Sequence, residues 1–516
     1  MAFVSNVGIA FQQVLRTHAN RTALRYPGAG VQIGYGELGA LADRIAAGMH
    51  GYGLTQGSVV AMFHDKSPAA YAAMLACLRL GVIYTMLDPE SPWARLHKIL
   101  STCKPTLLLS AFAICPHAPE IEAAGFGKPV VLDNFLQDKH APQLPDPSRI
   151  VGSTPAYIMF TSGSTGNPKG AVMSHANLLW FIQWSRERFS IAPDDVLTNV
   201  NPIYFDNSVF DFYSAIFNGA TLVPVTAAQV RDPRILVRSI HETACTIWFS
   251  VPSLLIYLLT TRAISKADFP GIRKIIFGGE GFPKTKLKIL YEMFGERAEL
   301  ENVYGPTECT CSCSAHTIEP NDFDDMQSLA TLGPVSQNFD FEILPQDPSE
   351  PTFGELFLRG PHVGLGYYND PERSSRSFIQ NPTHTLYADI GYRTGDLVKL
   401  DEHGNLHFKG RADFQIKHMG YRIELEEIEA AFSTLSDIKE CAVIYETLGE
   451  GMGQILAFVG TEPNTDADKL IARIATLVPA YMVPRRAWVL DTLPKNANGK
   501  IDRHALKKLA AAKKAT

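Results

Sequence analysis

The sequence predicts an α/β fold: a large N-terminal domain of layered, mostly parallel α/β sheets with a β-rich subdomain, followed by a small α+β C-terminal domain. Short β-branched runs alternate with longer amphipathic stretches over most of the chain. Strands joined by helices form largely parallel sheets that are covered on both faces. Beyond about residue 340 the pattern changes to short strands and turns, and the final segment again combines helices with strands. That segment has about 100 residues, a normal length for a small domain.

The apolar runs of the large domain are short enough to be buried strands. They lie at 59–63, 82–86, 105–109, 130–132, 157–160, 221–225, 246–250 and 274–277. Between them, apolar residues recur at helical spacing over 35–51, 67–80, 176–189 and 283–293. The window 69–87 is the most membrane-like, but Arg79 and Gly81 interrupt it. It is therefore predicted to be a buried helix followed by a strand.

The second half of the chain predicts shorter elements. Strands are expected at 355–359, 397–400 and 405–409, then a helix at 424–433, strands at 440–445 and 455–459, and a helix at 466–477. A polar Gly/Arg/Asp segment at 410–413 is typical of a linker, so we divide the chain into domains at 1–410 and 411–516. The Lys/Ala-rich tail after residue 505 indicates a helix end.

The composition excludes several classes of protein. The 516 residues include 47 Lys and Arg against 53 Asp and Glu, a net charge of −6, whereas a dedicated nucleic-acid binder usually carries a basic excess. Eight cysteines are too few for a disulfide scaffold, and polar residues interrupt residues 1–24, so no secretory signal is predicted. We expect a cytoplasmic protein with no nucleic-acid partner and no membrane span.

A Gly-rich loop directly follows the strand predicted at 157–160. Residues 161–170 contain three glycines and four hydroxyl side chains. The backbone N–H groups of such a loop can point at an anion that one lysine neutralises, which suits the phosphates of a nucleotide. The loop is not a Walker A motif, because Lys169 is followed by Gly170 rather than by Ser or Thr.

The segment 157–177 resembles the phosphate loop of the adenylate-forming superfamily, which includes acyl-CoA synthetases, luciferases and the adenylation domains of nonribosomal peptide synthesis. Further family motifs follow in the family's order. They are Asn-Val-Tyr-Gly-Pro-Thr-Glu at 302–308, Tyr-Arg-Thr-Gly-Asp at 392–396, Gly-Arg-Ala-Asp-Phe-Gln-Ile-Lys at 410–417 with Gly-Tyr-Arg-Ile-Glu at 420–424, and Asn-Gly-Lys-Ile-Asp at 498–502. The five motifs extend over most of the chain, which is identified as a member of this superfamily.

The resemblance implies that ATP activates a carboxylic acid as an acyl-adenylate with release of pyrophosphate, in which positioning and charge neutralisation carry the catalysis. It implies Lys500, Lys169 and Glu308 as catalytic residues, with Glu308 binding Mg²⁺, a cation that prefers oxygen ligands. The implied ATP site comprises Thr161, Ser162, Gly163, Ser164, Thr165, Gly166, Lys169, Gly279, Glu280, Asn302, Tyr304, Gly305, Thr307, Asp396, Arg411 and Lys500. Asp413 is the implied hinge of a mobile C-terminal domain, so that Lys417 and Lys500 face the active site in different states.

One residue indicates which acid is activated. In amino-acid-activating members, an Asp in an F-D-x-S run binds the substrate ammonium, and Asp206 stands in such a run at 205–208. A carboxylate is what a buried cation requires. The alternative is that Asp206 caps the helix that begins near Val209. By alignment to the motifs, the pocket walls include Asn207, Phe210, Phe249, Ile276, Gly278, Val303, Cys311 and Ser312. No further charge is present, so a small or medium uncharged amino acid is predicted.

The acceptor of the acyl group is expected to be a separate molecule, because no phosphopantetheine attachment motif follows Lys500. The peptide-synthesis character of the motifs at 392–396 and 498–502 favours a stand-alone carrier protein with phosphopantetheine over coenzyme A. The segments 205–213 and 278–280 also resemble D-alanine–carrier protein ligases, so D-alanine is the main specific alternative. Asp206 argues against an acyl-CoA synthetase for a non-amino acid, and the motif lysines argue against a non-catalytic nucleotide-binding protein.

Three cysteines, Cys309, Cys311 and Cys313, alternate with other residues. If the run is a strand, all three thiols share one face. Zinc sites usually combine such a pair with a second, distant pair, which the sequence lacks, so small core or pocket thiols are favoured over a metal site.

Overall fold

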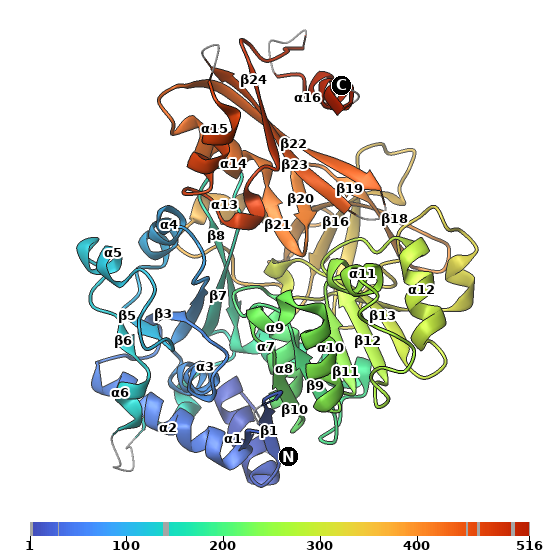
Figure 1. Ribbon diagram of the computed structural model, residues 1–516. Coiled ribbons are helices and arrows are strands. Elements are labelled where there is room, and N and C mark those ends of the chain that lie inside the picture. The colour runs from blue at the N-terminus through green and yellow to red at the C-terminus, as the bar shows by residue number, and fades with distance from the viewer. Residues whose placement is uncertain are drawn as a thin grey trace. The chain divides into compact units, whose positions relative to one another are not determined.

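The computed structural model describes residues 4–28, 30–137, 144–449, 452–461, 465–496 and 501–514 (Figure 1). The chain divides into two compact units. The first contains residues 1–89, 102–160 and 170–412, and the second contains residues 90–101, 161–169 and 413–516. The second unit thus combines the C-terminal part of the chain with two short segments from its first half.

An eight-stranded sheet forms the centre of the first unit. Its order is β14 (Ser314–Thr317), β13 (Glu299–Tyr304), β12 (Lys274–Gly278), β11 (Ile247–Ser250), β9 (Val196–Asn199), β10 (Thr221–Pro224), β1 (Thr22–Arg25) and β2 (Gln32–Gly34). The strands from β13 to β1 are parallel, and the edge strands β14 and β2 are antiparallel to their neighbours. The carboxyl ends of β9, β11, β12 and β13 therefore lie along one edge of the sheet.

A six-stranded sheet is the second layer. Its order is β6 (Val130–Val131), β5 (Leu107–Ser110), β3 (Val59–Phe63), β4 (Ile83–Leu87), β7 (Pro155–Thr161) and β8 (Lys169–Ser174). The pairs from β6 to β7 are parallel. Residues of β3, β4 and β5 are fully or almost fully buried, as expected of a parallel sheet covered on both faces.

Helices cover both faces of the eight-stranded sheet. One core contains buried residues of α1 (Val7–His18), α2 (Tyr35–Gly51), α3 (Pro68–Leu80), α7 (His175–Phe189) and α8 (Asn207–Ile216). The core on the opposite face contains residues of α10 (Pro233–Glu242), α11 (Pro252–Thr260) and α12 (Lys284–Phe294). Side chains alternate between the faces along each strand: Phe249 and Ile276 belong to the first core, and Trp248 and Phe277 to the second.

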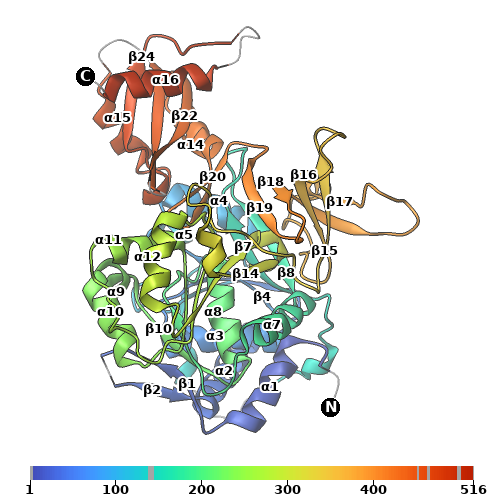
Figure 2. The same cartoon turned by 90° about the vertical axis from the view of Figure 1, so that its right-hand side faces the viewer.

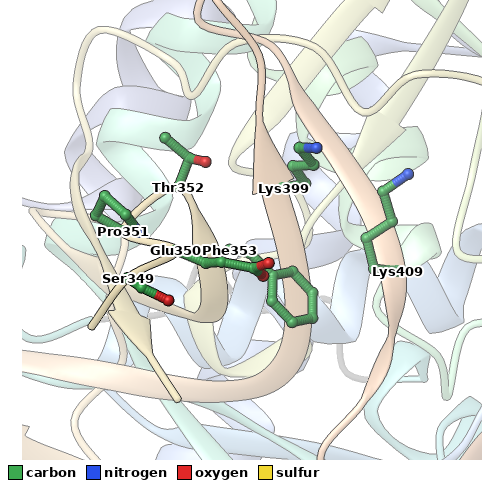
Figure 3. Close-up of a pocket in the computed structure, with 7 residues that line it drawn as sticks. All are labelled: Ser349, Glu350, Pro351, Thr352, Phe353, Lys399 and Lys409. Atoms are coloured by element: carbon green, nitrogen blue, oxygen red, sulfur yellow. The ribbon is translucent and has the colours of Figure 1, made fainter. Parts of the chain in front are cut away.

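The β-rich subdomain contains an antiparallel sheet of five strands. These are β15 (Asp340–Pro345), β16 (Phe353–Arg359), β17 (Phe378–Gln380), β18 (Ile390–Leu400) and β19 (Leu406–Arg411), with α13 (Pro371–Ser377) before β17. An open groove of about 500 Å³ on this subdomain is lined by Ser349, Glu350, Pro351, Thr352, Phe353, Lys399 and Lys409 (Figure 3). None of these seven belongs to the family motifs.

The C-terminal part of the second unit is an α+β structure (Figure 2). A hairpin of β20 (Gln415–His418) and β21 (Tyr421–Glu424) precedes a sheet of β22 (Ile438–Gly449), β23 (Met452–Thr461) and β24 (Arg486–Leu490). The helices α14 (Leu425–Ser433) and α15 (Ala467–Ile474) pack on one face of this sheet, and α16 (Arg503–Lys514) packs on the other. The segment 90–101 of this unit holds most of α4 (Trp93–Cys103).

The predicted fold class is confirmed, and α2 has the predicted bounds. The strand predicted at 105–109 begins two residues later, because Pro105 cannot donate to a ladder. The strands predicted at 440–445 and 455–459 are longer than expected, since they form one hairpin. The remaining helices are α5 (Ala118–Ala123), α6 (Asp133–Leu136) and α9 (Ala227–Arg231). In the described part of the chain, no helix is long and apolar enough to cross a membrane.

Candidate active site

The predicted pocket residues of the first unit meet at the carboxyl ends of its central strands. Phe249 is opposite Ile276, and Gly278 is opposite Val303, in neighbouring parallel strands. The side chains of Phe210, Phe249, Ile276, Val303 and Cys311 all belong to the same buried core. A side chain at Gly278 would overlap the Val303 carbonyl, so this position requires glycine.

Two phenyl rings form the most closely packed wall of this pocket. The ring centroids of Phe210 and Phe249 are 4.7 Å apart, and both side chains are 1% exposed. Phe210 also makes edge contacts with Phe181 and Phe189. This packing fixes both rings, because an interior at such density has little freedom to rearrange.

Asp206 occupies the N-cap position directly before α8, but its side chain makes no capping hydrogen bond within the described residues. Its carboxylate instead accepts a hydrogen bond of 2.5 Å from the Thr307 hydroxyl, contributed by the motif at 302–308. Burial raises the pKa of the Cys311 thiol, and the negative charge of Asp206 raises it further. The predicted alternative, a helix cap, is therefore wrong, and the carboxylate is oriented by Thr307 next to Cys311.

The remaining predicted pocket residues, Asn207 and Ser312, lie next to Gly279 and Gly305. A side chain at Gly279, whose φ is +90°, would lie 3.5 Å from the Asn207 amide, so the two are neighbours. Ser312 is buried, and its hydroxyl contacts the Cys311 sulfur at 3.6 Å. A side chain at Gly305 would come within 2.5 Å of the Ser312 Cα, which brings the motif loop against the pocket wall.

Asp396, Tyr304 and Arg411 form a buried cluster in the first unit. Asp396 and Arg411 are opposite residues of β18 and β19, and their side chains form an ion pair. The Tyr304 hydroxyl donates to the other Asp396 oxygen at 2.5 Å. Burial, followed by the charge of Asp396, raises the pKa of Tyr304 well above its ordinary value. These three predicted ATP-site residues are thus brought together around one carboxylate.

Three further predicted site residues make hydrogen bonds within the first unit, two of them in the motif at 302–308. Glu308 is fully buried and accepts from the Tyr367 hydroxyl at 2.7 Å. The Asn302 side-chain amide donates to the Thr331 carbonyl at 2.7 Å, so this side chain holds the loop. The Glu280 carboxylate accepts from the Ser253 backbone N–H at 3.0 Å, at the start of α11.

The Gly-rich loop belongs to the second unit, where carboxylates contact its donors. The Gly163 N–H donates to Glu427 at 3.1 Å, and Lys169 lies 3.6 Å from Glu424. The Ser162 hydroxyl donates to the Arg422 carbonyl at 2.7 Å. Arg95 of α4 forms a buried ion pair with Glu427. This loop therefore binds negative charge with a backbone N–H and a lysine, as a phosphate site requires.

Three further loop residues have distinct surroundings. Ser164 and Thr165 are exposed. The buried Thr161 hydroxyl has no hydrogen-bond partner among the described residues, which is uncommon for a buried polar group. Gly166 has a φ of +77°, a conformation that favours glycine, and its carbonyl accepts from Lys98 at 2.7 Å.

The residues assigned from the hinge and the C-terminal motif are only partly described. Asp413 begins the C-terminal segment of the second unit, and its carboxylate accepts from the Gln415 N–H at 3.2 Å. Lys417 lies in β20. Lys500 lies outside the described residues, so its role stays a prediction.

The three cysteines do not form a strand, and all three are core residues, as the sequence favours. Cys309 ends a short 3-10 helix, Thr310 and Cys311 have φ values of 57° and 74°, and β14 starts only at Ser314. Consequently Cys309 and Cys313 lie in the core of the β-rich subdomain, and Cys311 lies in the main core. Across the described ranges no group of three metal-binding side chains is found.

Two sets of buried polar residues lie next to the predicted sites and were not predicted from the sequence. One is the pair Arg95 and Glu427 beside the Gly-rich loop. The other is Asn199, Asn201 and Asp211, next to the predicted pocket residues Phe210 and Phe249. Their only signal in the sequence is the presence of polar residues in otherwise apolar runs, which does not reveal their partners.

Comparison with known proteins identifies the family. Residues 11–368 match the AMP-binding enzyme family, and residues 427–500 match the AMP-binding enzyme C-terminal domain. The chain is 34% identical over 472 residues to an L-proline–[L-prolyl-carrier protein] ligase of Pseudomonas fluorescens, covering 88% of this chain and 89% of the relative. It is 31% identical to a D-alanine–D-alanyl carrier protein ligase of Bacillus licheniformis, covering 92% and 94%.

A solved structure has a similar fold. PA1221, an NRPS protein containing adenylation and PCP domains, is similar with a TM-score of 0.83 at 23% identity, over 97% of this chain and 84% of that chain. This similarity supports the fold alone. With the family match and the sequence relatives added, the chain belongs to the AMP-binding enzyme family of adenylate-forming ligases, which use ATP.

Proposed function

We propose that this protein activates an amino acid with ATP and passes it to a separate carrier protein. In the first step the amino-acid carboxylate attacks the α-phosphate of ATP, forming an aminoacyl-adenylate and releasing pyrophosphate. In the second step the phosphopantetheine thiol of the carrier attacks the acyl carbon, and AMP leaves. Relatives named as carrier protein ligases, at 31–34% identity over most of their length, support this proposal.

The orientation of Asp206 is the observation that carries the proposal. Its carboxylate does not cap α8 and accepts a hydrogen bond from the Thr307 hydroxyl. The predicted pocket residues around it carry no charge. A negative charge in this position suits the α-ammonium group of an amino acid and would be unfavourable for a fatty or aryl acid, which has no cation to pair with it.

The ATP site is proposed residue by residue. Asp396, held by Tyr304 and Arg411, would accept hydrogen bonds from ribose hydroxyls. The Gly163 N–H, Lys169 and the Thr161 hydroxyl suit phosphate oxygens, because each offers a donor. Glu308 is the residue proposed to hold Mg²⁺, which would neutralise phosphate charge when bound. The remaining predicted ATP-site residues stay proposals on the same motifs.

The roles of the two predicted domains are also a proposal. Residues 1–410 would bind ATP and the amino acid, and residues 411–516 would form a small domain that moves about Asp413. A hinge of this kind absorbs the backbone change at a few positions. We propose a cytoplasmic location, which suits the eight free cysteines.

The pocket favours a small or medium uncharged amino acid, because Phe210 and Phe249 fill one wall. D-Alanine is the second candidate, supported by the relatives named D-alanine–D-alanyl carrier protein ligases. A panel of L- and D-amino acids in amino-acid-dependent ATP–pyrophosphate exchange tests the proposal. We expect one small uncharged amino acid to give the highest exchange. Exchange that occurs with organic acids but with none of the amino acids in the panel would contradict the proposal.

Replacing Lys500 by Ala tests the catalytic lysine. A lysine at the reacting carboxylate and α-phosphate stabilises the negative charge that concentrates there, and removal of one such donor costs about 10²- to 10³-fold in rate. We expect Lys500→Ala to reduce pyrophosphate exchange by that factor and to leave the circular dichroism spectrum and thermal midpoint unchanged. Lys495→Ala, five residues earlier, is the matched control. Wild-type exchange in Lys500→Ala would contradict the assignment.

A further inference from the structure

Three buried polar side chains lie behind the amino-acid pocket, on the side of α8 that faces the central sheet. Asp211 of α8 and Asn199 of β9 are 0% exposed, and Asn201 is 4% exposed. The Asp211 carboxylate accepts from the Asn199 amide at 2.7 Å and from the Asn201 amide at 3.0 Å. Figure 1 shows α8 next to β9, β10 and β11. The three side chains connect α8 with β9 and β11.

One end of this cluster is anchored in the sheet. Asn199 accepts from the Tyr71 hydroxyl at 2.6 Å, and its backbone carbonyl accepts from the Lys66 ammonium at 2.7 Å. The same ammonium binds the Val225 carbonyl at 2.8 Å, so it joins the carboxyl ends of β9 and β10. Lys66 has a φ of 64°, and a non-glycine residue persists in that conformation only where its surroundings determine it.

The other end of the cluster reaches the pocket wall. The Asn201 amide also donates to the Phe249 carbonyl at 3.2 Å, and the Phe249 ring packs on Phe210. Phe210 precedes Asp211 in α8, and Asp206 is the N-cap residue directly before the same helix. The cluster therefore connects both phenyl rings and the helix that carries Asp206 to one carboxylate.

A buried carboxylate is unfavourable for stability unless it is fully paired, and apolar replacements of buried ion pairs are often neutral or stabilising. Burial raises the pKa of the Asp211 carboxyl above its ordinary value. The hydrogen bonds from Asn199 and Asn201 and the charge of Lys66 oppose this shift without cancelling it. Burial lowers the pKa of the Lys66 ammonium below its ordinary value, although the charge of Asp211 opposes this shift. Since an apolar replacement of such a cluster is often at least as stable, stability alone does not account for these polar residues, and their contacts with α8 and Phe249 point to a role in fixing geometry.

We propose that Asp211 is a positioning residue for the amino-acid pocket: through Asn199 and Asn201 it fixes α8 and Phe249, and thereby sets the positions of Asp206, Phe210 and Phe249. This inference rests on the proposed function of the pocket. It predicts that the cluster controls recognition of the amino acid and has little influence on recognition of ATP.

Asp211→Asn tests the proposal, because it preserves the volume and removes an acceptor from two amide donors. We expect the KM for the amino acid in pyrophosphate exchange to rise tenfold or more, since a buried amide is left unpaired, and the KM for ATP to change less than twofold. Asn201→Ala, which removes the link to Phe249, should show the same selective effect. The double variant should be little worse than Asp211→Asn, because residues of one network are not additive.

Asp195→Asn is the matched control. Asp195 is also a buried aspartate, 5% exposed, but it precedes β9 at the opposite end of the strand, where it pairs with Arg273 and Thr246. We expect Asp195→Asn to lower the thermal midpoint without raising the KM for the amino acid. The positioning role would be overturned if both variants lost similar stability and if Asp211→Asn, like Asp195→Asn, changed the KM for the amino acid no more than the KM for ATP.

The outcomes separate the two proposals. Wild-type protein without amino-acid-dependent exchange would contradict the proposed function. Active wild-type protein, with wild-type KM for the amino acid in Asp211→Asn, would overturn this inference alone. If Asp211→Asn does not fold, Asn201→Ala decides in the same way, because it leaves the hydrogen bond between Asn199 and Asp211 in place.

Discussion

Asp206→Ala is expected to lower kcat/KM for the amino acid by about 10²- to 4 × 10³-fold. Removing one partner of a buried charge pair costs about 3–5 kcal/mol, and each 1.4 kcal/mol corresponds to a factor of ten. The loss is expected to fall on the complex with the amino acid, because Asp206 is the carboxylate proposed to pair with the substrate ammonium, whereas its bond with the Thr307 hydroxyl is made to a neutral group. Pyrophosphate exchange at varied amino-acid concentration measures it.

Two variants make this result specific. Asp206→Asn keeps the size of the side chain and removes its charge, so it should lose nearly as much as Asp206→Ala. Ser208→Ala removes a hydroxyl that donates to the Ile203 and Phe205 carbonyls in the same loop, and it should cost far less. If Ser208→Ala lowered kcat/KM for the amino acid as much as Asp206→Ala, the loss would come from a changed loop conformation and not from the missing charge.

Asp396→Ala is expected to raise the KM for ATP at least tenfold and to lower the free energy of unfolding by about 3–5 kcal/mol. Both effects have one cause: the substitution removes the acceptor of Tyr304 and leaves the Arg411 guanidinium buried without its carboxylate. Steady-state exchange at varied ATP and urea unfolding measure the two quantities.

Glu301→Gln separates binding from stability in this experiment. Glu301 lies in the same strand as Tyr304, is fully buried, and pairs with Arg188 at 2.6 Å. Its substitution should lower the free energy of unfolding while the KM for ATP stays within about twofold. An equal rise of the KM for ATP in Glu301→Gln would contradict the assignment of Asp396 to the nucleotide.

The α/β layers can be predicted from the sequence because hydrophobic periodicity is a local property, and the helix at 35–51 is predicted with its final bounds. Phe249, Ile276 and Val303 are predicted as pocket residues by alignment to the family motifs, and the structure places them on neighbouring parallel strands. The F-D-x-S run predicts Asp206 but leaves two roles open, and only the hydrogen bond from Thr307, a distant residue of the chain, decides against the cap.

Features that depend on distant partners or on unusual backbone are not predictable in this way. Alternating cysteines suggest a strand, but left-handed conformations at Thr310 and Cys311 separate the thiols between two cores. Asp211 stands in an apolar helix without any pattern around it, and its partners come from a different strand and its following loop. Such contacts are set by tertiary packing, which single-sequence patterns do not contain.

The most direct test of the central claim, that the pocket selects an amino acid through its ammonium group, is a comparison of matched acids in pyrophosphate exchange. D-Alanine, L-alanine and L-proline are compared with propionate, which keeps the carbon skeleton of alanine and lacks the amine, and with cyclopentanecarboxylate, which has a methylene in place of the ring nitrogen of proline. We expect exchange with at least one amino acid and background exchange with its amine-free counterpart. Equal exchange with and without the amine would contradict the claim.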